Sequence, residues 1–195
     1  MDIKRIFLVS LIGSLSVSAL IGIMIFLVGD FDELQVRVLL TTLMFGLYSL
    51  TGLCSAALYE KGRYQTYAAA AIGTSVAAFV LGLISIWGSD PGEGLLKLTL
   101  ASLVAAVGMA HAALLLRITP KNPAVRWSLA FTNACIAIVA AMLILLILDT
   151  EIGEADSYFR LLGVFGILDV LGTVVTPLLQ KFGSAADLPS GDDSV

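Results

Sequence analysis

Charged residues are few in this sequence. Asp, Glu, Lys and Arg make up 13% of its 195 positions, whereas 58% of the positions are hydrophobic. A soluble domain of this length has no interior large enough to bury so much apolar surface, so the composition excludes an ordinary water-soluble protein. The net charge of −4 also argues against nucleic acid as a partner, because surfaces that bind nucleic acid are basic. We therefore expect lipid to be the solvent of this chain.

Side chains that bind metals or catalyse reactions are equally scarce. The chain has one histidine, His111, and two cysteines, Cys54 and Cys135, neither of which belongs to a CxxC pair. One histidine cannot supply both axial ligands of a haem, and no second group of metal ligands is present, so we expect no metal, no cofactor and no disulfide. Motifs of the types GxxxxGK(S/T), HExxH and GxSxG are missing too. These absences favour a protein that is not an enzyme.

Long apolar runs are what the sequence has in quantity. Each of six runs is long enough, at about 1.5 Å per residue, to cross a hydrocarbon core of roughly 30 Å as a helix. The predicted spans are residues 6–28, 36–58, 65–87, 95–116, 126–148 and 159–180, within a transmembrane domain of residues 1–182. The predicted fold class is an all-α integral membrane protein. Because the first run continues to Val28 without a break, we expect an uncleaved helix there and not a signal peptide.

The basic residues predict how the chain is oriented. Most of them lie at the N-terminus, between the second and third spans, between the fourth and fifth, or after the sixth, whereas the opposite side is rich in Asp and Glu. By the positive-inside rule both termini then face the cytoplasm, and the protein is a multi-pass component of the cell (cytoplasmic) membrane. Residues 183–195 are small, polar and acidic, and we expect them to form a flexible cytoplasmic tail.

Three of the predicted spans begin with the same pattern, an acid followed four residues later by a base. The pairs are Glu33 and Arg37, Glu93 and Lys97, and Asp156 and Arg160, and the copies lie 60 and 63 residues apart. An acid in the first turn favours the positive end of the helix dipole, and a base one turn later pairs with it. A structural role is the main interpretation, and a ring of pairs around an outer vestibule is its rival. With the short connections, the repeat predicts three tandem antiparallel hairpins.

One carboxylate lies inside a predicted span. Asp169 follows Arg160 by nine residues, which places it roughly 13 Å below the outer interface at about 1.5 Å per residue. Insertion of Asp at such a depth costs on the order of 2.5–3.5 kcal/mol, so we expect a compensating environment. Three interpretations are open: a protonated group that joins helices by a hydrogen bond, a carrier of protons or cations, and a contact for a polar group of a partner subunit.

Three further polar residues are candidates for an intramembrane site. His111 and Asn133 lie at a similar depth in neighbouring spans, and a structural hydrogen bond between them is favoured over a proton relay or a pigment ligand. Tyr48, midway along the second span, is the hydroxyl whose depth best suits Asp169. The candidate site therefore comprises Asp169, His111, Asn133 and Tyr48, and no metal.

Parts of the chain resemble a known class of protein. The segments VLLTT at 38–42, SLTGLC at 49–54, RLLGV at 160–164 and ILDVLGT at 167–173 are similar to small six-helix membrane proteins of prokaryotes. This resemblance covers most of the chain and implies a membrane class without a particular activity.

Two functions of different kinds follow from these observations. The first is a non-catalytic accessory or scaffold subunit that packs with lipids and with another membrane protein or a second copy of itself. Seams of small residues support it, because they let helix backbones approach closely; they are Ser14, Ser18 and Gly22, and Ala69, Gly73 and Ala77. The alternative is a small proton-coupled or ion-conducting transporter that uses Asp169, with His111 in support.

Overall fold

The computed structural model describes residues 32–120, 122–149 and 156–183, together with residues 16, 19–20 and 22–24. Five long helices account for nearly all of this part of the chain. They are α2 (Glu33–Tyr59), α3 (Gln65–Trp87), α4 (Glu93–Leu116), α5 (Pro123–Leu148) and α6 (Asp156–Gly183).

All five helices are long and apolar enough to cross a membrane. The prediction of an all-helical chain with membrane-type helices is thereby confirmed for the described residues. Most of the predicted first span, residues 6–28, lies outside them, and so does the predicted tail beyond residue 183. The count of six spans, and the side of the membrane on which each end lies, stay predictions.

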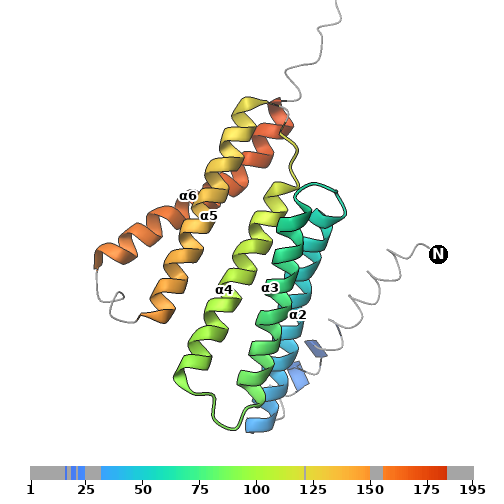
Figure 1. Cartoon of the computed structure of the whole chain (residues 1–195), viewed down its shortest axis with the longest axis vertical. Coiled ribbons are helices and arrows are strands. Elements are labelled where there is room, and N and C mark those ends of the chain that lie inside the picture. The colour runs from blue at the N-terminus through green and yellow to red at the C-terminus, as the bar shows by residue number, and fades with distance from the viewer. Residues whose placement is uncertain are drawn as a thin grey trace, which may run out of the picture.

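The helices lie side by side and alternate in direction. Figure 1 shows α2, α3 and α4 running along one another, with α5 beyond α4 and with α6 crossing α5. Each helix contacts the next along the chain, and α2 also contacts α4. Because α2 packs on α3 as well as α3 on α4, the contacts do not divide the described helices into separate hairpins, and the hairpin repeat stays a prediction.

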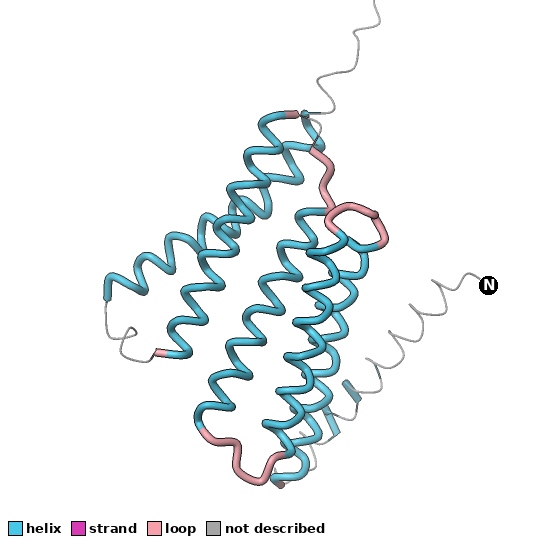
Figure 2. The backbone as a smooth tube through the Cα atoms, viewed as in Figure 1, coloured by secondary structure: helices cyan, strands magenta, loops and turns pink. Residues whose placement is uncertain are grey.

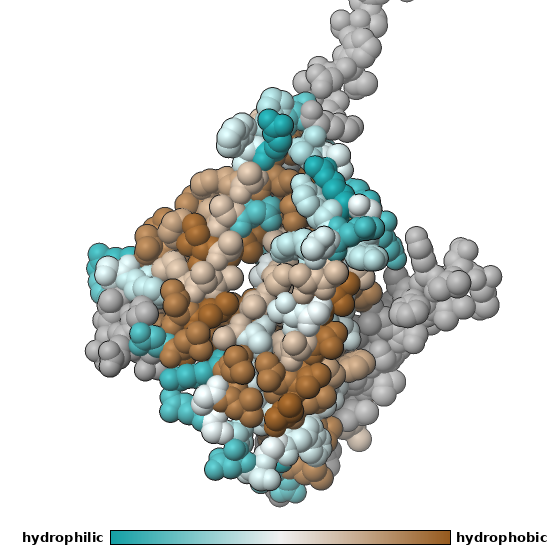
Figure 3. All heavy atoms as spheres, viewed as in Figure 1, coloured by the Kyte–Doolittle hydropathy of each residue, from teal (hydrophilic) through white to brown (hydrophobic). Residues whose placement is uncertain are grey.

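Basic and acidic loops lie at opposite ends of the bundle. The loops at 60–64 and 117–122 share one end, and the loop at 88–92 lies at the other (Figure 2). Lys61 joins the first two loops, since its ammonium group donates to the main-chain carbonyl of Arg117. The side surface between the ends is covered mainly by apolar side chains (Figure 3), as expected of a surface in contact with lipid.

Small side chains form the interior of the α2–α3–α4 group. One buried cluster joins Tyr48, Ala78 and Ala106, and another joins Leu58, Ala68 and Ala113. Alanine at these positions lets the helix backbones approach closely, which is how helices gain van der Waals contact in a solvent as apolar as themselves.

Proline marks two places in the second half of the chain. Pro123 opens α5, where its missing N–H would have no partner in the helix. Pro177 lies inside α6, which nevertheless continues to Gly183. A proline at this position leaves the carbonyl of Thr173 without its usual donor, so α6 is weakened between Asp169 and its C-terminal end. In the predicted orientation this end faces the cytoplasm.

Candidate functional site

The three acid–base pairs form within their own helices. The N···O distances are 2.5 Å for Glu33 and Arg37, 2.8 Å for Glu93 and Lys97, and 2.6 Å for Asp156 and Arg160. Their acidic side chains are 80%, 79% and 81% exposed. Among the described residues these are the salt bridges present, and none joins two helices, so the geometry supports a role at helix ends and not a closed ring.

A histidine, a hydroxyl and a carboxylate connect α4 to α6. His111 on α4 places Nε2 3.0 Å from Oγ1 of Thr173 on α6. The same hydroxyl donates to Oδ1 of Asp169, one turn earlier in α6, over 3.5 Å. Because a hydroxyl has a single proton, a Thr173 that donates to Asp169 must accept from His111, which requires the proton on Nε2. The structure therefore links the two intramembrane ionisable groups that the sequence left unconnected.

Asp169 and His111 also line one groove. It lies between α4, α5 and α6 and has a volume of about 270 Å³. Its lining residues are Leu103, Val104, Val107, Gly108, His111, Ile136, Val139, Ala140, Leu143 and Asp169. The two ionisable side chains are thus set in walls that are otherwise apolar. Apolar walls with a few polar groups are the usual composition of binding sites in proteins.

The two helices α5 and α6 meet at a cluster of hydroxyl groups. Thr176 Oγ1 lies 2.8 Å from Ser128 Oγ and 3.4 Å from Thr132 Oγ1, and Thr132 in turn donates to the carbonyl of Ser128 over 2.8 Å. Thr132 and Thr176 are fully buried. Gly172 lies against them so closely that a Cβ there would be 2.2 Å from Thr132 Oγ1. This contact brings the backbones of α5 and α6 together.

Sequence analysis missed this hydroxyl cluster, although a signal for it exists. Ser128 and Thr132 are four residues apart on α5, and Gly172 and Thr176 are four residues apart on α6. Each pair is a short seam of small and hydroxyl residues, of the kind that lets membrane helices approach and hydrogen-bond. The seams that were recognised lie elsewhere, in residues 14–22 and 69–77.

The predicted bridge between His111 and Asn133 is wrong. Asn133 Nδ2 donates to the carbonyl of Leu129 in its own helix over 2.8 Å, and His111 bonds to Thr173 instead. Asn133 lines a second cavity of about 550 Å³, together with Tyr67, and His111 is not among the residues of that cavity. The two side chains share a depth, but they point to different faces of the α4–α5 pair.

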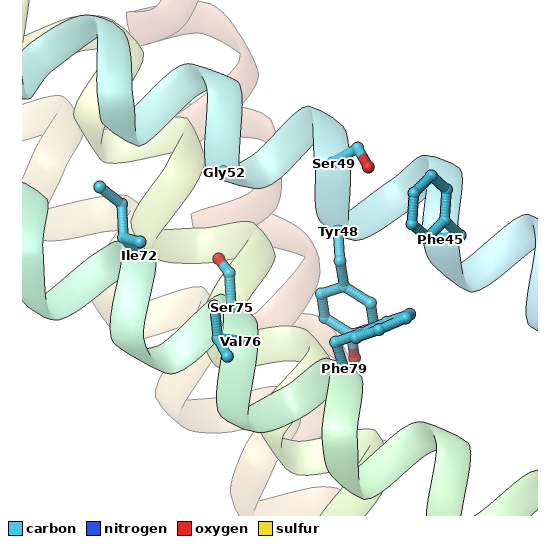
Figure 4. A pocket seen from close by; sticks show the side chains of 8 residues that line it. All are labelled: Phe45, Tyr48, Ser49, Gly52, Ile72, Ser75, Val76 and Phe79. Atoms are coloured by element: carbon cyan, nitrogen blue, oxygen red, sulfur yellow. The ribbon is translucent and has the colours of Figure 1, made fainter. Parts of the chain in front are cut away.

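Tyr48 is likewise not the partner of Asp169. Its ring packs edge-on against Phe79 with centroids 5.8 Å apart, beside a cavity of about 170 Å³ between α2 and α3 (Figure 4). Its hydroxyl is buried and has no hydrogen-bond partner in the described part of the chain. The residues packed around Tyr48 lie on α2, α3 and α4, and Asp169 is not among them.

The cysteines and the acidic residues form no metal site in the described residues. Cys54 and Cys135 are both free thiols, the first half-buried and the second buried. No group of three or more His, Cys, Asp or Glu side chains comes together there. Asp169 and His111 are the Asp, Glu, His, Lys or Arg side chains that share one groove in the described helices.

Comparison of the chain with protein-family models, with curated proteins and with solved structures gives no match.

Proposed function

We propose that this chain is a non-catalytic membrane protein that acts by binding laterally to another membrane protein, as an accessory or scaffold subunit. The observation that carries the proposal is the environment of Asp169 on α6. The other described helices serve as the comparison, because their polar side chains are buried more completely than Asp169 is.

Helix α6 is covered less by its own chain than α4 is. Among its described side chains only Thr176 is buried, whereas seven residues of α4 are buried. An exposed apolar face does not by itself call for a partner, since lipid tails are as apolar as leucine. The argument therefore depends on what is polar along α6.

Asp169 is the polar group that lipid cannot satisfy. It is half-buried, and the neighbouring Ile167 and Val170 are 70% and 66% exposed. Within the described residues its one side-chain hydrogen bond comes from Thr173 over 3.5 Å, which is beyond the usual range for a hydroxyl donor. A carboxylate held in this way keeps most of its insertion penalty of about 2.5–3.5 kcal/mol.

A donor from another protein would relieve that penalty. Gly22, one of the described positions near the N-terminus, lies by α2, since a Cβ there would be 3.8 Å from Leu39 Cδ1. Polar residues on the lipid-facing side of membrane helices pair with groups of neighbouring helices. Lateral assembly through α6 is the function that this geometry supports best.

Native mass spectrometry tests the proposal. The protein would be tagged at its C-terminus and extracted gently from its own membranes. We expect a companion membrane protein at fixed stoichiometry. A bare monomer under several mild detergents and in lipid nanodiscs would contradict lateral assembly.

Proton-coupled transport is the second candidate, and the continuity of His111, Thr173 and Asp169 favours it. A histidine and a carboxylate joined through one hydroxyl are suited to pass a proton between them. Reconstituted vesicles with an internal pH-sensitive dye would report such movement. Asp169→Asn should abolish it if Asp169 carries the proton, while an equal flux in the variant would exclude that role.

A further inference from the structure

We infer that the groove between α4, α5 and α6 receives a basic side chain, Lys or Arg, from a transmembrane helix of a different protein, with Asp169 as its counter-ion. The inference rests on the proposed function and adds the chemistry of the partner. Three observations lead to it: the carboxyl group at the groove, the shape of the groove, and the absence of Lys and Arg among the described residues that line it.

Asp169 brings a carboxyl group to the groove, and none of the described Lys or Arg side chains lines it. Arg37, Lys97 and Arg160 are each held by an acid in the first turn of a helix. The other described basic residues lie in the basic loops or at the ends of α5 and α6 next to them; they are Lys61, Arg63, Arg117, Arg126 and Lys181. None of these eight side chains is among the residues that line the groove at Asp169. An intramembrane carboxylate is stabilised chiefly by pairing with an opposite charge.

The shape of the groove suits a long side chain better than water. With a volume of about 270 Å³ the groove has room for a side chain, whereas a buried water would need two to four polar partners. Apart from His111 and Asp169 the walls are apolar, as at Val104, Val139 and Leu143. The aliphatic stem of Lys or Arg would pack along such walls, while the charged end reaches Asp169.

The position of His111 agrees with an external cation. His111 bonds to the hydroxyl of Thr173 and not directly to Asp169. One oxygen of the carboxylate accepts the long bond from Thr173, and the described residues provide no hydrogen bond to the other. A carboxylate has about four lone-pair sites, so a guanidinium or ammonium group would find acceptors free.

A second copy of this chain does not fit the groove. None of the six apolar runs has Lys or Arg in its middle, because the basic residues of the sequence lie at or near the ends of those runs. A phospholipid does not fit either, since its acyl chain leaves Asp169 without a donor and its charged headgroup stays at the interface. The occupant must therefore be a span of a different protein that has a basic residue near its middle.

The test compares four forms of the tagged protein extracted from native membranes: the wild type, Asp169→Asn, Asp169→Glu and Asn133→Ala. Asn133 is the matched control, because it is a half-buried polar residue at the same bundle level that lines a different cavity. We expect the amount of companion protein to fall about tenfold in Asp169→Asn and to stay near the wild-type amount in the other two variants. The melting temperature of each variant in detergent would show that folding is retained.

Exchange of the two charges completes the test. The companion should have a Lys or Arg within a span. A companion in which Asp replaces that residue should fail to assemble with the wild-type chain, but it should assemble with the Asp169→Lys variant. Undiminished capture by Asp169→Asn, or a failed restoration, would overturn the charge pairing while lateral assembly stands. A wild-type protein without any companion would overturn lateral assembly itself.

Discussion

The two halves of the bundle are held together in different ways. Between α2, α3 and α4 the interior consists mainly of alanine and apolar clusters, and the buried hydroxyls of Thr51, Ser55 and Ser75 donate to carbonyls of their own helices. The hydrogen bonds that cross between these helices involve Tyr67, Ser85, Trp87 and Thr99. Between α5 and α6, by contrast, the fully buried hydroxyls of Thr132 and Thr176 bond across the helix contact, and His111 on α4 bonds to Thr173 on α6. The first half is therefore held mainly by close packing, whereas the second also depends on buried polar groups that bond from one helix to the next.

This difference has a consequence for function. Close packing of small apolar residues is indifferent to what lies outside the bundle, because lipid and protein are equally apolar neighbours. The energy of a carboxylate near the middle of the membrane does depend on its surroundings, because it is set by the hydrogen-bond donors within reach. The α5–α6 side is therefore the side on which we expect a partner to act.

Gly172 offers the strongest way to test the comparison. A Cβ at this position would be 2.2 Å from Oγ1 of Thr132, which is fully buried and bonded to Ser128, so it has no space to move away. We expect Gly172→Ala to lower the free energy of unfolding by about 2 kcal/mol. Unfolding in mixed SDS micelles would measure the change.

Gly166 provides the control for this prediction. It lies on the same helix, and a Cβ there would have no atom within 4 Å. Gly166→Ala should therefore leave the unfolding free energy nearly unchanged, or raise it slightly through better helix propensity. Equal losses from the two variants would mean that α5 and α6 do not make the close contact described.

Tyr48 is expected to show an effect of opposite sign in the first half. Its hydroxyl is buried without a partner in the described residues, and an unsatisfied buried hydroxyl costs about 1 kcal/mol or more. Tyr48→Phe should raise the unfolding free energy by about 1 kcal/mol. In Tyr67→Phe the same change removes a donor to the carbonyl of Met109, so a loss is expected there. A loss in both variants would show that the Tyr48 hydroxyl has a partner.

Thr176→Val tests the hydroxyl cluster with a smaller expected effect. The substitution removes the bonds to Ser128 and Thr132 while it keeps the shape of the side chain. Measured hydrogen bonds between membrane helices average about 0.6 kcal/mol, so a loss of about that size is expected. Thr74→Val is the control, since Thr74 bonds only to the carbonyl of Ala70 in its own helix. A loss at Thr74 as large as that at Thr176 would deny the cluster any special role.

Gly82 completes the comparison with the smallest effect. A Cβ there would be 2.5 Å from Met44, but the atoms met are the sulfur and terminal methyl of a flexible side chain. We expect Gly82→Ala to lower the unfolding free energy by less than about 0.5 kcal/mol, because methionine adapts readily. The ratio of the Gly172 and Gly82 effects thus measures how much more rigid the α5–α6 contact is. A loss at Gly82 that matches the loss at Gly172 would remove the contrast between the two halves.

Much of the local structure was predictable from the sequence. The five described helices follow from the apolar runs, and their bounds differ from the predicted spans by at most three residues at every end. The ion pairs of Glu33, Glu93 and Asp156 could be predicted equally well, because residues four apart meet on any helix. Both kinds of prediction depend only on neighbours along the chain.

The candidate site was predicted less well. Asp169 and His111 were chosen for their cost in lipid, and both line the same groove. Their partners were predicted from depth, and both predictions were wrong: Asn133 bonds within its own helix, and Tyr48 packs with residues of α3 and α4 and its hydroxyl has no partner in the described residues. Depth follows from the rise of about 1.5 Å per residue, but direction changes by about 100° at each residue.

The sequence by itself determined that lipid surrounds this protein, where its described helices run, and which residues pair at the helix ends. These are local properties of composition and of helical spacing. Only the tertiary structure decided that Thr173 stands between His111 and Asp169, that Gly172 fits against Thr132, and that Tyr48 is left without a partner. The physical reason is that contacts across helices depend on how each helix is rotated and which helix lies next to it, and both are set by the packing of the whole bundle.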